Sequence, residues 1–302
     1  MSVQLKKLVQ IPIFEQLKTL LVMNCVFFEF AGGFVDDGCD IHIVRNFNDL
    51  QDGGIILLDD AAGKYIENQQ LYEDIATKCP NSIFICWYWM NCEYKPPFKN
   101  IIFTGEYYLN NNCTDEKKRN YFSLPNYVPL RLRANDPPRL IGSYPRNVVR
   151  DYCFMGGGYK RNWVPDNSTG LTGIYHQVFT NEYLSYNKRR EIYLSSMFAF
   201  GFQSDENIIN GHLSQRIFEG LAYGCIVLCE NPLASTFTDG AVIYVSSKEH
   251  LLQTMLYYKK NPELVRKKQE QGYEWVRKYG TNRYSATFFL EKIKELYNIG
   301  FI

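Results

Sequence analysis

The residues with the clearest chemical potential lie in the segment NGHLSQRIFEGLAYGCIVLCENP, which runs from Asn210 to Pro232. Arg216 and Glu219 are three residues apart in a stretch with helical periodicity, so at about 100° per residue they share one face. Ser214 stands where an N-cap is expected, and the free amide groups of a first helical turn attract anions. We therefore predict that this helix start and Arg216 bind a diphosphate, and that Glu219 accepts hydrogen bonds from a ribose.

The same periodicity divides the predicted helix into two faces. Gly220 and Tyr223 share the polar face with Arg216 and Glu219, and we expect this face to look into a cleft. The apolar face, expected to pack on a sheet, comprises Ile217, Phe218, Leu221 and Ala222. A simpler alternative stays open, in which Arg216 and Glu219 form an i,i+3 salt bridge on a solvated face.

A second chemistry-bearing segment is FMGGGYKRNW, in which Gly156, Gly157 and Gly158 end an apolar run and precede Lys160 and Arg161. Glycines let the backbone approach phosphates closely, and the two basic residues neutralise their charge. The spacing matches neither a Walker loop nor G-x-G-x-x-G. The segment is therefore a predicted phosphate contact, with a tight turn carrying surface cations as the alternative.

A carboxylate in a loop with room for a substrate can act as a general base. The loop EFAGGFVDDGCD is expected to follow a first strand, and its glycines leave room for a substrate, so we predict Asp36 or Asp37 as the base. Glu29 and Asp59, which follows the apolar run GGIILL, are the reserve candidates. Ordinary turn chemistry explains Asp-Asp-Gly equally well.

Composition narrows the classes of function. The 302 residues include 33 Lys plus Arg against 32 Asp plus Glu, so no basic field predicts a nucleic-acid partner. The nine cysteines are odd in number and lie mostly in apolar runs, as expected of a reduced, cytoplasmic protein. The apolar run TLLVMNCVFFEF is too short to span a bilayer, and no residue pattern predicts a metal site.

The elements that must position these residues alternate between short apolar runs and helical patterns. In the first half, predicted strands are KTLLVMNCVFF, CDIHIVRNF, GGIILLDD, SIFICWYWM and NIIFTGEYY, with a helix at NQQLYEDIATKCP. In the second half, predicted strands are RDYCFMGGG, TGIYHQVF, FAFGFQ, CIVLCE and AVIYVSS, with helices at NKRREIYLSSM, LSQRIFEGLAYG and residues 248–280, the last broken at Pro262. This alternation predicts α/β domains with mainly parallel sheets.

A proline-rich segment separates the halves. We predict a first domain over residues 1–130, a linker over 131–147, a second domain over 148–280 and a helix over 281–302 that packs on the first domain. That helix carries apolar residues at near-helical spacing, namely Phe288, Phe289, Ile293 and Leu296.

The motif S-x-R-x-F-E-x-L-A-x-G at Ser214–Gly224, together with the glycine turn, resembles the donor-binding half of GT-B glycosyltransferases, in particular the CgeB-like type. Exostosin-like and fucosyltransferase families share a related motif. The resemblance covers about residues 151–279. It implies two Rossmann-like domains facing across a cleft.

Carried over residue by residue, the resemblance implies that Arg216 and Arg161 contact the donor diphosphate and that Glu219 contacts the ribose. The turn made by Asn210, Gly211 and His212 would lie near the sugar or phosphates. His212 has a structural, hydrogen-bonded role as its alternative. Retaining relatives carry a second glutamate where this chain has Gly211, so either stereochemical outcome stays open.

The sequence thus predicts a glycosyltransferase that moves a sugar from a nucleoside-diphosphate sugar to a glycan or other hydroxyl acceptor. The donor is a substrate, so no resident cofactor is expected. The Asp-x-Asp motif of metal-dependent GT-A enzymes does not occur after a predicted strand, which predicts a metal-independent reaction. Two alternatives remain: a sugar-nucleotide epimerase or hydrolase on the same fold, and a noncatalytic nucleotide- or sugar-binding protein.

Overall fold

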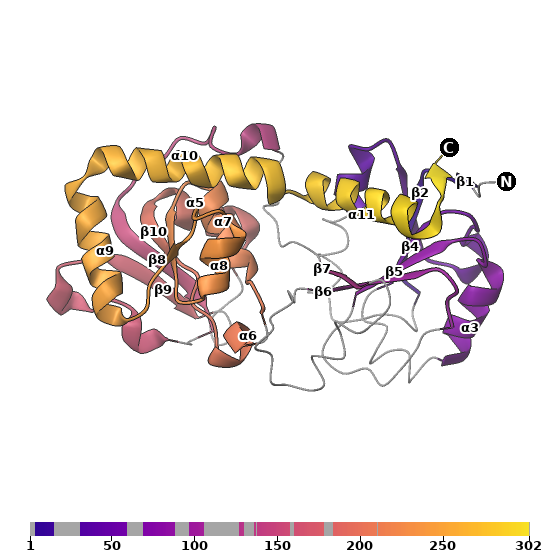
Figure 1. Ribbon diagram of the computed structural model, residues 1–302, viewed down its shortest axis with the longest axis horizontal. Helices are drawn as coiled ribbons and strands as arrows, with labels where there is room; N and C mark the ends of the chain where they lie inside the picture. Colours follow the sequence, from indigo (N-terminus) through magenta and orange to yellow (C-terminus); the bar gives the residue numbers. More distant parts are fainter. Residues whose placement is uncertain are drawn as a thin grey trace. The chain divides into compact units, whose positions relative to one another are not determined.

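The computed structural model divides the chain into two compact units (Figure 1). The first unit comprises Met1–Arg131 and Asn282–Ile302, and the second comprises Leu132–Thr281. The residues that the structure describes are 4–14, 31–58, 69–87, 97–105, 127–129, 136, 138–157, 160–177, 184–209 and 211–301.

The first unit is built on a six-stranded parallel sheet with strand order β3-β2-β4-β5-β6-β7. Its strands are β2 (Leu8–Pro12), β3 (Asp40–Val44), β4 (Ile55–Leu58), β5 (Ile83–Trp87), β6 (Ile101–Gly105) and β7 (Tyr127–Pro129). The chain moves from β2 outward to β3 and then crosses back to β4. The strand order therefore reverses between β2 and β4.

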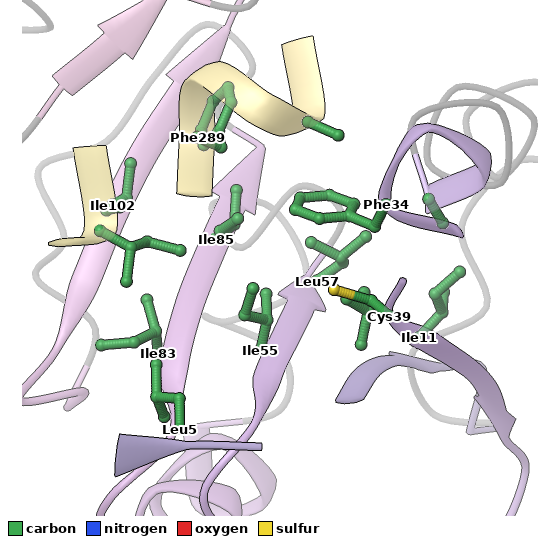
Figure 2. Close-up of a cluster of buried hydrophobic side chains, with 14 of the residues drawn as sticks. Leu5, Ile11, Phe34, Cys39, Ile55, Leu57, Ile83, Ile85, Ile102 and Phe289 are labelled. Carbon is green, nitrogen blue, oxygen red and sulfur yellow. The ribbon is translucent and has the colours of Figure 1, made fainter. Parts of the chain in front are cut away.

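Apolar side chains cover both faces of this sheet because neighbouring residues of a strand point to opposite sides. Ile55 and Leu57 join the cluster drawn in Figure 2, where Phe289 and Phe34 lie over the strands. Ile56 and Leu58 join a second cluster, which contains residues of helix α3 (Gln69–Lys78). A helix therefore covers each face, as the near-continuous apolar strands predict.

The last helix, α11 (Asn282–Tyr297), belongs to the first unit. Ala286, Phe289 and Ile293 are buried in the cluster of Figure 2. The Tyr297 hydroxyl donates to the carbonyl oxygen of Ile101 at 2.7 Å. After α11, β13 (Gly300–Phe301) pairs in parallel with β1 (Gln4–Leu5). The chain thus returns to the first unit, as the sequence analysis expected.

The second unit contains a five-stranded parallel sheet with order β12-β11-β10-β8-β9. Its strands are β8 (Arg150–Gly156), β9 (Gly173–Gln177), β10 (Ser196–Phe200), β11 (Ile226–Cys229) and β12 (Ile243–Tyr244). Its α-helices are α5 (Tyr186–Leu194), α6 (Asp205–Ile209), α7 (Gln215–Ala222), α8 (Pro232–Phe237), α9 (Lys248–Lys260) and α10 (Pro262–Tyr279). Here the strand order reverses between β8 and β10.

Short 3₁₀ turns complete the described elements: Phe47–Asp49 in the first unit, and Pro138–Leu140, Arg161–Trp163 and Asn167–Thr169 in the second. Both sheets are parallel and alternate with helices. The predicted α/β fold of two Rossmann-like domains is therefore confirmed.

The structure bears on three predictions about elements: the first strand, the linker and the faces of helix α7. The predicted strand KTLLVMNCVFF lies outside the described residues, and the first long strand is instead β2, at Leu8–Pro12. Residues 132–147, which we assigned to a linker, fall within the second unit. Arg146 explains their attachment, because its guanidinium donates to the carbonyl oxygens of Tyr223 and Ser196.

The predicted faces of α7 are wrong for Gly220, whereas buried Ile217, which was assigned to the sheet-facing side, lies beside Gly201 just after β10. Gly220 packs on the sheet, since a Cβ built there would lie 2.7 Å from Val227 and 3.1 Å from Ala199. On another side of the helix, Phe218 stacks on Trp275 of α10. The helix is enclosed between the sheet and α10, so Gly220 is buried against the sheet and does not look into a cleft.

Candidate functional site

The carboxyl ends of β8 and β10 define the candidate site. In open parallel α/β sheets, ligands bind outside the carboxyl ends of the strands, at the point where the strand order reverses. In the second unit this point lies between β8, which ends at Gly156, and β10, which ends at Phe200. Arg216 from α7 reaches it: its Nη1 donates to the Phe202 carbonyl oxygen at 2.5 Å.

Arg216 has unused hydrogen-bonding capacity. Its guanidinium lies over the Phe154 ring, with 5.8 Å between the carbon Cζ and the ring centroid. Among the described residues, no carboxylate forms an ion pair with it, and Phe202 is its one hydrogen-bond acceptor. Burial lowers the pKa of Arg216, and the charges of Tyr193 and Cys229 oppose this shift. A cation with free donors is therefore available to an anion.

Gly156 is required for the approach of this arginine. A Cβ at Gly156 would lie 2.5 Å from the Phe154 ring and 2.8 Å from Nη1 of Arg216. Any other residue would displace one of these side chains. Gly156, the first glycine of the predicted turn, thus lies directly beside Arg216.

Ser214 adds a second free polar group at the same helix start. It is the N-cap of α7, but its side chain makes no capping hydrogen bond. Its Oγ is buried and has no hydrogen-bond partner. A buried hydroxyl without a partner costs stability, which a ligand that pairs with it would restore. Ser214 and Arg216 thus lie together at the start of α7, as the sequence predicts.

Glu219 differs from the expected solvent-facing carboxylate, because it is buried between α7 and α5. Its Oε1 accepts from Arg189 at 3.3 Å and from Gln215 at 3.2 Å, and its Oε2 accepts from the Tyr193 hydroxyl at 3.3 Å. The salt bridge from Glu219 therefore runs to Arg189, and not to Arg216 as the simpler alternative proposed.

A hydrogen-bonded network fixes the turn at Gly211 and His212. Gly211 has a φ of 72°, in the left-handed region that favours glycine. The Gln203 amide lies 3.1 Å from Nδ1 of His212 and donates to the His212 carbonyl oxygen at 3.0 Å. Asn231 also donates to this carbonyl oxygen, at 3.2 Å. The hydrogen-bonded role that we left open for His212 is therefore observed.

Glu230 completes this edge of the sheet. It directly follows β11, and only 8% of its surface is exposed. Its Oε1 accepts from the Gln203 backbone N–H at 2.6 Å, and its Oε2 from the Cys229 thiol at 3.8 Å. Burial raises the pKa of Glu230, opposed by the Gln203 hydrogen bond and by the charge of Lys160.

Sequence reasoning missed Gln203, Glu230 and Asn231. They belong to no spaced motif, but Gln203 ends the predicted strand FAFGFQ, Glu230 ends the predicted strand CIVLCE, and Asn231 follows it. The rule that ligands bind at the carboxyl ends of parallel strands would have selected all three.

The remaining candidates in the second unit are less completely described. Gly157 follows β8, Gly158 and Asn210 lie outside the described residues, and the side chain of Arg161 is also outside them. Lys160 has a φ of 54° and pairs with Asp205 at 2.7 Å.

The predicted base does not lie where we expected it. Asp36 and Asp37 follow the helical residues 31–35 and precede β3, so they lie at the amino edge of the first sheet. Lys7, just before β2, donates to the Asp37 backbone carbonyl oxygen, and the Asp37 carboxylate accepts from Thr287 at 2.8 Å. The loop with Asp36 and Asp37 thus precedes β3, and the strand that we expected before this loop lies outside the described residues. Glu29 and Asp59 lie outside the described residues.

Two further observations concern metals and membranes. Within the described residues, no three His, Cys, Asp or Glu side chains gather in a way that would hold a metal ion. No helix in that part of the chain combines the length and the apolar character needed to cross a membrane.

The chain and its fold belong to a known class. Residues 139–291 match a family model described as glycosyl transferase-like. This match spans just over half of the chain, which therefore belongs to this glycosyl transferase-like family. A sequence comparison with curated proteins finds no match.

Solved structures share the fold over nearly the whole chain. A glycosyltransferase from Rickettsia africae ESF-5 aligns with a TM-score of 0.59 and 13% identity, covering 96% of this chain and 98% of that one. A glycosyltransferase of avilamycin A biosynthesis gives 0.57 and 10%, covering 96% and 98%. Sucrose-phosphate synthase from Thermosynechococcus elongatus gives 0.57 and 7%, covering 96% and 99%. These structures establish the two-domain GT-B fold.

Proposed function

We propose that this protein transfers a sugar from a nucleoside-diphosphate sugar to a hydroxyl acceptor, and that the donor binds at the carboxyl edge of the second sheet. The observation that carries the proposal is Arg216, a cation at the reversal point of the strand order with no ion-pair partner among the described carboxylates. Buried or partly buried charges are normally paired in folded proteins. A diphosphate supplies the missing partner.

The surroundings of Arg216 favour a diphosphate over a simple halide or carboxylate. The amide groups at the start of α7 and the free Ser214 hydroxyl provide further donors beside the guanidinium. One turn along the helix, Glu219 has the acceptor oxygens that a ribose diol needs. We propose that the ribose replaces Gln215, which donates to this carboxylate through a neutral amide.

The same groups support the chemistry of transfer. The acceptor oxygen bonds to the anomeric carbon, the bond from that carbon to the diphosphate breaks, and the hydroxyl proton passes to a base. Negative charge develops on the leaving diphosphate, where Arg216 and the helix start stabilise it. We therefore propose a metal-independent reaction, and we expect turnover to persist in EDTA. The narrower likeness to CgeB-like enzymes is part of this proposal, since its motif falls within the family match.

The base is proposed to come from the first unit. There the strand order reverses between β2 and β4, and β4 ends at Leu58, directly before Asp59 in the chain. Asp59→Asn should lower turnover by a factor on the order of 10²–10⁴ while donor affinity is retained. Asp36→Asn, at the amino edge, is the control and should leave turnover unchanged. Normal turnover in Asp59→Asn would remove it as the base.

The decisive test of the donor site is calorimetry of Arg216→Ala with UDP, GDP and TDP. The variant should lose about 1.5–3 kcal/mol of binding free energy for the nucleotide that the wild type binds, which is the range for a charged hydrogen bond. Arg266→Ala, an exposed arginine on α10, is the matched control. Unchanged affinity in Arg216→Ala would reject the donor site. Release of free sugar without an acceptor would favour hydrolysis over transfer.

A further inference from the structure

Glu230 and Arg216 are held by one and the same peptide group. The carbonyl oxygen of Phe202 accepts from Arg216 at 2.5 Å, and the N–H of Gln203 donates to Glu230 at 2.6 Å. This carbonyl and this N–H belong to a single planar peptide unit, and in a trans peptide they point in opposite directions. The guanidinium and the carboxylate therefore lie on opposite sides of that unit, at most about 7 Å apart.

Because the peptide unit lies between them, the Arg216 guanidinium and the Glu230 carboxylate do not form an ion pair. Arg216 remains available to an anion, and Glu230 keeps acceptor capacity of its own. Among the described residues, the hydrogen bond found for Oε2 of Glu230 is the weak contact with the Cys229 thiol at 3.8 Å. A carboxylate oxygen can accept more than one hydrogen bond, and a thiol is a poor donor.

The ligand group that suits Glu230 is a hydroxyl. A second phosphate is excluded by like-charge repulsion, whereas hydroxyl groups donate strong hydrogen bonds to carboxylates. A sugar ring joined to a phosphate places its hydroxyls within a similar distance of that phosphate, so a sugar whose phosphate lies on Arg216 could reach Glu230 around the peptide unit that separates the two groups.

We propose that Glu230 is a specificity-determining residue whose Oε2 accepts hydrogen bonds from ring hydroxyls of the sugar to be transferred. This inference rests on the proposed donor site at Arg216. The purely structural alternative is that Glu230 only receives the Gln203 N–H. Glutamine would serve that role equally well, because its amide oxygen accepts the same hydrogen bond. Glu230→Gln therefore separates the two roles.

The experiment compares each nucleotide with its sugar conjugate in calorimetry on the full chain. The probes are UDP and UDP-glucose, GDP and GDP-mannose, and TDP and TDP-glucose. In Glu230→Gln we expect the Kd of the bound sugar conjugate to rise by roughly 10–100-fold, while the Kd of the free nucleotide changes less than about threefold. Glu274→Gln, on the exposed side of α10, is the matched control. Thermal unfolding of each variant verifies that it is folded.

A second measurement identifies the hydroxyl. Donor analogues that lack one ring hydroxyl at a time are titrated into the wild type and Glu230→Gln. For the hydroxyl that Glu230 contacts, the wild type loses affinity and the variant shows little additional loss. Equal effects of Glu230→Gln on nucleotide and conjugate, or no effect on either, would overturn the inference and leave the donor site intact. Failure of every nucleotide to bind the wild type would instead overturn the proposed function.

Discussion

Glu219 has an observed structural role beside its proposed role in ribose binding. Its carboxylate already accepts from Arg189 and Tyr193, so Glu219→Gln should reduce the free energy of unfolding as well as ribose binding. We expect a loss of about 1.5–3 kcal/mol in ribonucleotide binding and a smaller loss for the 2′-deoxy analogue. Calorimetry with UDP and 2′-deoxy-UDP, or the corresponding guanine pair, measures this difference. Equal losses for both nucleotides would argue against a ribose contact.

At this scale the sequence predicted some site residues and missed others for identifiable reasons. Ser214 and Arg216 were predictable because an N-cap and a first-turn cation have fixed positions at a helix start. Gln203 and Glu230 were missed because a single polar residue at the end of a strand belongs to no spaced motif, although its place at the carboxyl end of a parallel strand would have selected it. The loop with Asp36 was placed at the wrong edge, because the short strand β2 was not recognised in the sequence.

Helix α7 has almost no free surface, and this controls which substitutions it tolerates. A Cβ at Gly220 would meet Cγ2 of Val227 at 2.7 Å, and Val227 is a stiff, fully buried residue. We expect Gly220→Ala to lower the free energy of unfolding by about 1–3 kcal/mol in chemical denaturation, as overpacked cores do.

Gly272→Ala in α10 is the matched control for Gly220→Ala. Its new Cβ would meet Cδ2 of Leu221 at 3.1 Å, and this is the end of a side chain that can give way. Alanine also gains up to about 1 kcal/mol over glycine in helix propensity, so Gly272→Ala should be close to neutral. A similar loss in both variants would show that Gly220 is not limited by the sheet.

Periodicity determined which residues of α7 share a face, but not which face contacts the sheet. A helix with one buried side can be oriented from its apolar stripe. In α7 the sheet meets the small residue Gly220, while Phe218 packs on α10, so the most apolar stripe does not identify the sheet side. The helix end was simpler to predict, because Gly224 with a φ of 79° stops it.

Across the whole molecule, the chain begins and ends in the first unit, and the second unit is a continuous segment. The parallel α/β architecture was predictable because apolar strands buried on both faces alternate with helices. The attachment of residues 132–147 to the second unit was not, since proline-rich composition indicates irregular structure but gives no information about packing. Arg146, whose contacts are to backbone carbonyls, leaves no sequence pattern.

Because α11 packs in the core of the first unit, loss of its core contacts should destabilise that unit alone. Phe289 is fully buried in a cluster made of first-unit residues, so Phe289→Ala should cost about 3–5 kcal/mol of that unit's stability. Hydrogen exchange should show lost protection in β4 and β5, with β8 and β10 unchanged. Phe218→Ala, a fully buried phenylalanine of α7, should produce the opposite pattern. If Phe289→Ala instead deprotects both sheets equally, the two units unfold as one cooperative body, and nucleotide binding at Arg216 would then depend on the integrity of α11.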